Sequence, residues 1–329
     1  SIIGFYAVIN NKYQELKYAV IDWILVMKFF LIYLLSQIYT KHFDLSECSD
    51  LIYKSIKLII IVLSLFTIAN YISKIYPSEM RYGIMANKLF YEHPTYLAAV
   101  CIALIANIIL FSKKINKLYI FLCLIILAST MRFKAIAATV IILIIIIYVN
   151  KTNKKVSALK LGVVGLVAVI VAWSQIEYYF LDSEGSPRRL MIEASVSIAN
   201  ENFPIGTGFG TFGSYVSGEH YSPLYEIYGL NKVYGLKEGA TFFLSDSFWP
   251  MILGQFGYIG TIIYILAIIM IFWKMQKDFD KDNKNIYLAK ITCLAYLLIS
   301  SIAEASFANP IAIPLAIILG MEYRNNKNK

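Results

Sequence analysis

The sequence predicts an all-α polytopic membrane protein with about ten transmembrane helices and one large external loop. Hydrophobic residues make up 59% of the chain and charged residues 16%, against about 25% charged residues in an average globular domain. The mean hydropathy is +0.64. Apolar runs of roughly 17–22 residues recur along the chain, and an α-helix needs about that length to cross the hydrocarbon core of a bilayer.

Ten apolar segments follow one another, and each is expected to cross or enter the membrane. They are residues 1–9 (a partial span), 19–39, 55–73, 94–112, 118–130, 134–149, 161–180, 250–273, 286–303 and 310–321. The segments that face outward are then 10–18, 74–93, 131–133, 181–249 and 304–309. This pattern divides the chain into N-terminal transmembrane helices (1–180), a large external loop (181–249), and C-terminal transmembrane helices with a cytoplasmic tail (250–329).

The net charge of +9 comes from lysines and arginines that gather in the alternate, inward-facing loops. These loops are 40–57, 113–117, 151–160, 274–285 and 322–329. Basic residues in short loops mark the cytoplasmic side of a membrane protein, so the excess reflects topology and does not indicate nucleic-acid binding. The four cysteines lie within spans or in an inward loop, without the spacing of a zinc site. Neither an external disulfide framework nor a bound metal is expected.

The segment 19–39 carries two charges within an apolar run. Asp22 and Lys28 are six residues apart, which places them on different faces of an ideal helix and argues against a direct ion pair. A charge inside the bilayer costs about 2.5–3.5 kcal/mol. We therefore expect Lys28 to face protein or water, in a structural pairing or in a functional role.

The hairpin Leu127–Val140 turns on the outer side and carries two cations at its tip. Arg132 and Lys134 stand there against the positive-inside trend. Two cations near the start of the following helix suit an anion, and anchoring to lipid headgroups is the structural alternative.

The external loop opens with a predicted helix that starts at Pro187, a common residue at a first helical turn, and ends before Asn202. Arg189 and Glu193 are neighbours on this helix, whereas Arg188 points about 100° away from Arg189. The arginines either form surface ion pairs or grip a phosphate or pyrophosphate bidentately. The residues by themselves leave both explanations open.

Four glycines follow this helix: Gly206, Gly208, Gly210 and Gly213. They look like a phosphate cradle, but the segment has no lysine and no strand-helix-strand context. Neither a P-loop nor a dinucleotide fingerprint is therefore indicated. We expect these glycines to let the backbone turn sharply and approach either another helix or a ligand.

Five tyrosines come next, and aromatic rings with polar edges suit sugar rings as well as the bilayer interface. They are Tyr215, Tyr221, Tyr225, Tyr228 and Tyr234.

Three residues of the external segments are candidates for proton transfer. His220 lies in the long loop, His93 in the segment 74–93, and Asp246 where the chain re-enters the membrane. Each has a structural explanation too, as a satisfied polar residue or as a helix N-cap. Glu304 stands at a similar helix junction and is expected to be structural.

Three segments resemble the Wzy-type polysaccharide polymerases, a family related to the O-antigen ligases. RRLMIEASVSIANENFPIGTGFGTF (188–212) resembles the family's arginine followed by a proline and alternating glycines. SDSFWPMILGQFGYIGTIIYIL (245–266) resembles its re-entry span, and TMRFKAIAATVIILII (130–145) resembles its external Ser/Thr-x-Arg hairpin. One dominant external loop before the last spans matches the family's layout.

The resemblance implies a GT-C-type glycosyltransferase in the bacterial cytoplasmic (inner) membrane, with its active face external or periplasmic. The implied donor is an undecaprenyl-pyrophosphate-linked glycan of O-antigen or capsule biosynthesis, and the implied acceptor is a sugar hydroxyl of another lipid-linked repeat unit. No cofactor is implied. Membrane lipids, a flippase and a chain-length regulator are further candidate partners.

In this resemblance Arg132 matches the hairpin arginine, and Arg189 or Arg188 matches the arginine of the large loop. Both arginines would bind pyrophosphate and stabilise the negative charge that develops as the glycosidic bond breaks. The implied catalytic residues are Arg189, Arg132, Asp246 and His220, and the implied substrate-binding residues are Arg188, Lys134, Glu193, His93, Gly206, Gly208 and Gly210.

One departure from the family concerns the base. The ligases carry a His where this chain has Asp246 followed by Ser247, which puts ligase activity in doubt. Asp246, His220 or His93 is then the candidate base. A ligase-like transferase and a polysaccharide or lipid transporter are the alternative functions. Transporters place charges and broken helices at the midplane of the membrane, whereas the charges here lie outside.

Overall fold

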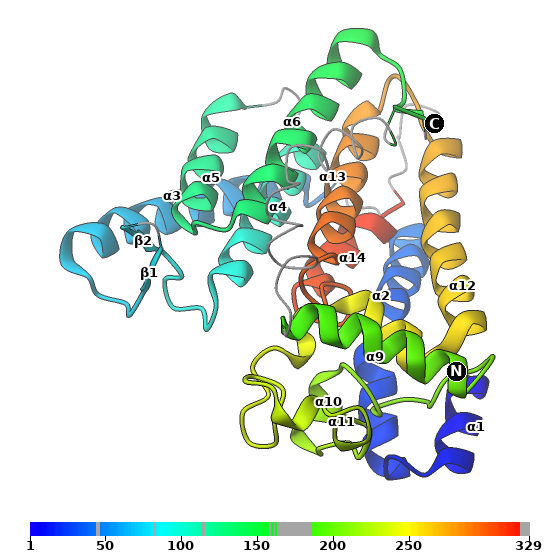
Figure 1. The fold of residues 1–329 in the computed structure, drawn as a ribbon. Helices are drawn as coiled ribbons and strands as arrows, with labels where there is room; N and C mark the ends of the chain where they lie inside the picture. The colour runs from blue at the N-terminus through cyan, green and yellow to red at the C-terminus, as the bar shows by residue number, and fades with distance from the viewer. Residues whose placement is uncertain are drawn as a thin grey trace. The chain divides into compact units, whose positions relative to one another are not determined.

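The computed structural model describes residues 1–43, 47–81, 83–112, 116–157, 159–160, 162 and 186–322, and Figure 1 shows the fold. Most of the described chain is helical, with one two-stranded sheet. The elements are α1 (Ile2–Asn11), α2 (Leu16–His42), α3 (Ser49–Ser73), β1 (Glu79–Arg81), β2 (Ile84–Ala86), α4 (Pro94–Phe111), α5 (Lys117–Ser129), α6 (Phe133–Thr152), α9 (Pro187–Glu201), α10 (Tyr215–Glu219), α11 (Leu224–Ile227), η2 (Leu230–Lys232), η3 (Leu244–Asp246), α12 (Phe248–Lys277), α13 (Lys284–Ser300) and α14 (Ala312–Gly320).

A helix stands at every predicted span except 161–180, a segment of which only residue 162 is described. In the described part of the chain, five helices have the length and apolar composition needed to cross a membrane: α2, α3, α4, α6 and α12. Two others, α1 and α5, are apolar but shorter. The fold is therefore that of a helical membrane-type protein, and the number of crossings stays a prediction.

Local sequence explains where several helices begin. His93 caps α4 and Pro94 occupies its first position, where proline's missing N–H leaves no hydrogen bond unmade. The Asn116 side chain caps α5 by accepting from the Leu118 N–H. The helix predicted to end before Asn202 is confirmed as α9, which has Pro187 at its first position. Each start follows from residues within one turn of the helix end.

The contacts group the chain into two units that interleave along the sequence. The first unit comprises Ser1–Lys28, Gly162–Trp273 and Ser300–Asn309, and the second comprises Phe29–Leu161, Lys274–Ile299 and Pro310–Lys329. The three consecutive parts expected from the sequence follow membrane topology, whereas the two units follow packing. Each unit is described by itself below.

In the second unit, α4 is the most enclosed of the membrane-type helices, with 78% of its most apolar stretch buried, against 22% for α3. β1 and β2 pair antiparallel in the segment before α4, with Glu79 opposite Ala86. This short sheet was not predicted, and it is a small addition to the mostly helical fold that the sequence predicted. Its strands have three residues each and are mostly exposed, so no alternating apolar pattern announced them. A residue of α3 helps to position the sheet: the Tyr71 hydroxyl donates to the Met85 carbonyl at 3.0 Å.

In the first unit, the glycine-rich segment packs against two helices. α12 is interrupted at Gly257, whose φ of 58° and ψ of −161° are not helical. At this interruption the Thr207 N–H donates to the Gly254 carbonyl at 3.1 Å and the Gly208 N–H to the Gln255 carbonyl at 2.7 Å. From α2, the buried Asp22 carboxylate accepts from the Gly210 N–H at 2.8 Å. Asp22 therefore anchors this segment.

Candidate functional site

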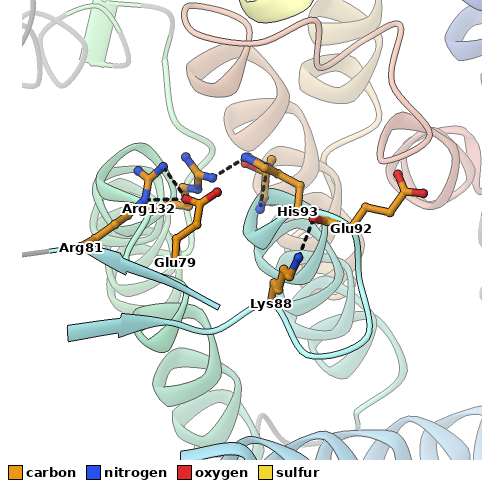
Figure 2. A network of polar contacts seen from close by, with 7 residues as sticks. Glu79, Arg81, Lys88, Glu92, His93 and Arg132 are labelled. Carbon is orange, nitrogen blue, oxygen red and sulfur yellow. Dashed lines mark hydrogen bonds and ion pairs between the residues drawn. The ribbon is translucent and has the colours of Figure 1, made fainter. Parts of the chain in front are cut away.

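A group of charged side chains surrounds the tip of the α5–α6 hairpin in the second unit, and Figure 2 shows most of it. We call this group the hairpin cluster: Glu79, Arg81, His93, Arg132 and Lys134. β1 carries the first two residues, His93 precedes α4, and the last two come from the start of α6. The chain turns sharply at Met131, with a φ of 51°, and so brings Arg132 to the N-cap position of α6.

His93 and Arg132 point toward each other in the hairpin cluster (Figure 2), and the Arg132 Nη2 contacts His93 Nε2. The other ring nitrogen of His93, Nδ1, accepts from the Thr95 N–H at 3.3 Å and caps α4. Partial burial of the ring and the positive charges of Arg132 and Lys134 lower the pKa of His93 to about 4. The imidazole is therefore neutral at neutral pH.

Glu79 is the carboxylate of the hairpin cluster. The Arg81 guanidinium donates to its Oε2 from Nη2 at 3.1 Å and from Nε at 3.3 Å. Burial raises the pKa of Glu79, but the hydrogen bond from Arg81 and the charges of Arg81 and Arg132 outweigh it, so the pKa lies below its usual value. Among the described residues, Arg81 and Arg132 act on the ionised Glu79 carboxylate, and Arg132, Lys134 and Arg81 act on His93, so basic side chains predominate in the described part of the hairpin cluster. Its side chains keep access to solvent, as a site for an anion requires.

Arg188 and Arg189 of α9 belong to the first unit, and each contacts a carboxylate. Arg188 Nη2 lies 3.1 Å from Asp246 Oδ2, with side chains 20% and 34% exposed. Arg189 Nε lies 2.8 Å from Glu193 Oε1, one turn along α9, with side chains 39% and 55% exposed. We call these contacts the loop arginine pairs. The predicted neighbours Arg189 and Glu193 do form an ion pair, and Arg188 reaches a residue 58 positions away.

Asp246 ends η3, two residues before α12 begins. The adjacent Ser245 carbonyl accepts from the Ala305 N–H at 3.1 Å, so the segment with the buried Glu304 packs beside it. The Trp249 indole N–H donates to the Ser301 hydroxyl at 3.1 Å. Asp246 is therefore held by η3, α9 and the segment after α13.

His220 lies at the C-terminal end of α10 and stacks on Tyr18, with ring centroids 3.4 Å apart and an angle of 17° between the ring planes. Its carbonyl accepts from the Gln14 side chain at 3.0 Å. These contacts give His220 a structural role at the junction of the loop with α2. They leave its proposed catalytic role as a hypothesis.

The glycines approach helices closely. A Cβ on Gly206 would lie 2.4 Å from the Gly257 nitrogen, and one on Gly208 would lie 2.6 Å from the Gly4 carbonyl of α1. Both residues also have positive φ, at 71° and 98°. Of the two alternatives that the sequence left open, a close approach to a helix is the one realised at Gly206 and Gly208.

The tyrosines of the loop divide into two groups. Tyr225 is fully buried, where its hydroxyl accepts from the Gly213 N–H at 2.8 Å, and Tyr221 and Tyr228 pack against the same small core. Tyr215 and Tyr234 are 65% and 70% exposed. Three of the five tyrosines therefore pack in the hydrophobic core of the loop, a role that the sequence did not suggest. The periodicity of a loop without long helices does not separate core tyrosines from surface ones.

The structure brings together two sets of residues that the sequence treated separately: His93 with Arg132, and Arg188 with Asp246. It adds Arg81 and Glu79, which were missed. Arg81 is a cation in a predicted external segment, and the same departure from the positive-inside trend that marked Arg132 would have found it. Arg132 and the loop arginines belong to different units, so their joint action stays a hypothesis.

Within the described ranges, no group of three or more His, Cys, Asp or Glu side chains is arranged to hold a metal ion.

No protein-family model matches the chain, and a search of curated proteins finds no match. Any function must therefore be inferred from the residues and their geometry.

Proposed function

We propose that this protein is a membrane polysaccharide polymerase. It joins undecaprenyl-pyrophosphate-linked oligosaccharide repeat units on the external face of the bacterial cytoplasmic membrane. The hairpin cluster is the observation that carries the proposal. It places solvent-accessible basic side chains, Arg81, Arg132 and Lys134, near the ends of two apolar helices, α4 and α6, that are long enough to span a bilayer. A lipid-linked pyrophosphate has the matching form, with an anionic group at the membrane surface and an apolar chain in the bilayer.

In the proposed reaction, a sugar hydroxyl of the acceptor attacks the anomeric carbon of the donor glycan. The bond to the lipid pyrophosphate breaks, the pyrophosphate leaves with the electron pair, and a base takes the hydroxyl proton. Arg132 in the hairpin cluster stabilises the charge that develops on the leaving pyrophosphate, as fixed positive groups do best. No nucleotide sugar is needed, because pyrophosphate is a good leaving group once it is neutralised.

The loop arginine pairs support different roles for the two arginines. A solvent-exposed ion pair such as Arg189–Glu193 is worth about 0.3–0.5 kcal/mol, so a pyrophosphate can displace Glu193 at little cost. The Arg188–Asp246 pair is less exposed and harder to separate. We therefore assign Arg189 to the pyrophosphate, Arg188 to the positioning of Asp246, and Asp246 to the transfer of the hydroxyl proton.

The test replaces Arg132 by Ala and measures polymer length in cells that depend on this protein for polymerisation. We expect a loss of about a hundredfold to a thousandfold in polymer formation, with accumulation of single lipid-linked repeat units. Lys237→Ala is the matched control, because this exposed cation lies outside the hairpin cluster. Full-length polymer from Arg132→Ala protein at normal abundance would contradict the proposal.

A further inference from the structure

We infer that α9 is an interfacial helix, which lies in the surface of the membrane with three apolar side chains among the lipids. These side chains are Ile192 and Val196 of α9 and Phe203, which follows the end of α9, and we call them the α9 stripe. The partner of the stripe is a lipid surface. The inference follows from the two kinds of exposed side chain on α9, from the contacts of α9 with α12, and from the apolar surface of α12.

The first argument is the division of the exposed part of α9. One side of this helix packs in the hydrophobic core of the loop. On the exposed part, Ile192 and Val196 lie within about 40° of each other around the helix axis. Glu193 and Glu201 are also exposed, but they lie about 100° and about 180° from Ile192. An exposed apolar stripe beside an exposed polar side is typical of a helix at the boundary between lipid and water.

The second argument is the place where α9 meets α12. The Tyr258 hydroxyl, directly after the interruption of α12, donates to Asn200 Oδ1 of α9 at 2.6 Å. The Ile259 N–H donates to the Pro204 carbonyl at 3.2 Å, and the rings of Phe203 and Tyr258 have centroids 6.0 Å apart. Figure 1 shows that α9 runs across α12 and not alongside it. The C-terminal end of α9 is therefore fixed where the uninterrupted part of α12 begins.

The third argument is the surface of α12 after this point. Four apolar side chains are exposed there at the spacing of one helix face: Ile259, Ile262, Ile263 and Leu266. Because α12 is long and apolar enough to cross a membrane, this face suits lipid. Phe203 is 71% exposed and contacts the ring of Tyr258, so the apolar surface of α12 continues into the α9 stripe. A tyrosine at such a junction is typical of the membrane–water interface.

An interfacial α9 has a consequence for the level of Arg189. This residue lies about 20° from Val196 around the helix axis, at the polar edge of the α9 stripe. Its apolar stem then follows the stripe while its guanidinium reaches the headgroup layer. A lipid-linked pyrophosphate would lie at the same level. This consequence rests on the proposed function, whereas the position of α9 does not.

The depth of α9 is measured with nitroxide labels on the full chain in phosphatidylcholine nanodiscs that hold one copy each. The chain carries Cys48→Ser, because Cys48 is exposed and the other three cysteines are buried. One label is attached at a time, to Ile192→Cys or Val196→Cys protein. Oxygen concentrates in lipid and a hydrophilic nickel chelate in water, so the ratio of their collision rates with the label gives the depth. We expect both labels about 5–10 Å below the headgroups.

Three further label positions are the controls. Ser197→Cys is the matched one, because Ser197 is the neighbour of Val196 but lies about 100° away on the polar side. Lys237→Cys should report water and Ile262→Cys should report lipid. We expect the nickel chelate to dominate at Ser197 and Lys237, and oxygen to dominate at Ile262. Dominance of the nickel chelate at Ile192, Val196 or Ile262, or of oxygen at Ser197, would overturn the inference.

A second copy of the chain is the alternative cover for the α9 stripe. Val196 would then be reached by the nickel chelate in nanodiscs with one copy and protected from it in nanodiscs with two copies. That result would overturn the inference.

The depth measurement and the polymer assay fail separately. If the labels are at the expected depth but Arg132→Ala protein makes full-length polymer, the polymerase proposal fails and the interfacial position of α9 stands. If Arg132→Ala protein makes no polymer but the label on Val196 is in water, the interfacial position fails and the polymerase proposal stands.

Discussion

The hairpin cluster and the loop arginine pairs use the same residue type in different ways. In the described part of the hairpin cluster, Arg132, Lys134 and Arg81 act on His93 together with the Glu79 carboxylate. On α9, Arg188 and Arg189 each contact a carboxylate. Adjacent arginines in a sequence therefore do not by themselves indicate an anion site. What indicates one is a local excess of positive charge, which depends on the residues that the fold brings near.

The difference has a consequence for the order of binding. Among the described contacts, Arg132 of the hairpin cluster meets a neutral imidazole, whereas Arg188 and Arg189 meet carboxylates that a phosphate would have to displace. We therefore expect the hairpin cluster to attract the pyrophosphate and the loop to respond to it. Three changes test this difference between the two groups of residues, and their expected effects decrease in the order given.

The largest effect is expected from separating Arg188 and Asp246. Arg188→Ala removes the cation that holds Asp246, and we expect polymer formation to fall about a hundredfold, like the loss of a preorganised group. A double-mutant cycle with Asp246→Asn should give a coupling of about 1 kcal/mol in the free energy of unfolding, because the pair is only partly exposed. Additive effects on the free energy of unfolding would show that Arg188 and Asp246 are not coupled. The Arg188–Asp246 pair would then be as weak as the exposed Arg189–Glu193 pair.

An intermediate effect is expected from the exposed pair. Arg189→Ala should weaken binding of the lipid-linked donor about tenfold, because one charged contact to the pyrophosphate is lost. Glu193→Gln is the matched change on the same pair, and it should tighten binding about twofold by removing a competitor worth about 0.5 kcal/mol. Donor affinity in nanodiscs measures both. Weaker binding by Glu193→Gln protein would mean that Glu193 supports Arg189 and does not compete with its ligand.

The smallest effect is expected from pH at the cap of α4. The pKa of His93 falls from an ordinary value of 6.5 to about 4 in the folded protein. Between these values the unfolded chain takes up a proton that the folded protein does not, so local stability is complete above pH 6.5 and decreases as the pH falls toward about 4. Hydrogen exchange at the Thr95 amide should report this as a loss of protection.

The cap of α5 is the internal control for this measurement, because Asn116 accepts from the Leu118 N–H at 3.1 Å and does not titrate. Protection at Leu118 should stay constant over the same pH range. His93→Asn should make the Thr95 amide behave like the Leu118 amide. Equal pH dependence at both caps would show that His93 does not govern the stability of α4.

Much of the fold follows from local sequence. The start of α9 at Pro187 and the turn between α5 and α6 at Met131 were predicted, because both depend on residues within one or two turns. The close approach of Gly206 and Gly208 to helices was one of two alternatives that the sequence left open, because positive φ and a missing side chain suit a helix contact and a ligand equally well. The β1–β2 hairpin was missed, because its six paired residues carry no apolar alternation.

Two properties follow from the sequence alone: the protein is a helical membrane-type chain, and most of its helices lie where the apolar runs predict them. These properties depend on the length of apolar runs and on residues close in sequence. The tertiary structure alone decided which charges meet. Arg132 contacts His93 across 39 positions and Arg188 contacts Asp246 across 58, and both contacts require packing between distant segments. The physical reason is that hydrophobic length is a local quantity, whereas an electrostatic environment is the sum over all groups that the fold places nearby.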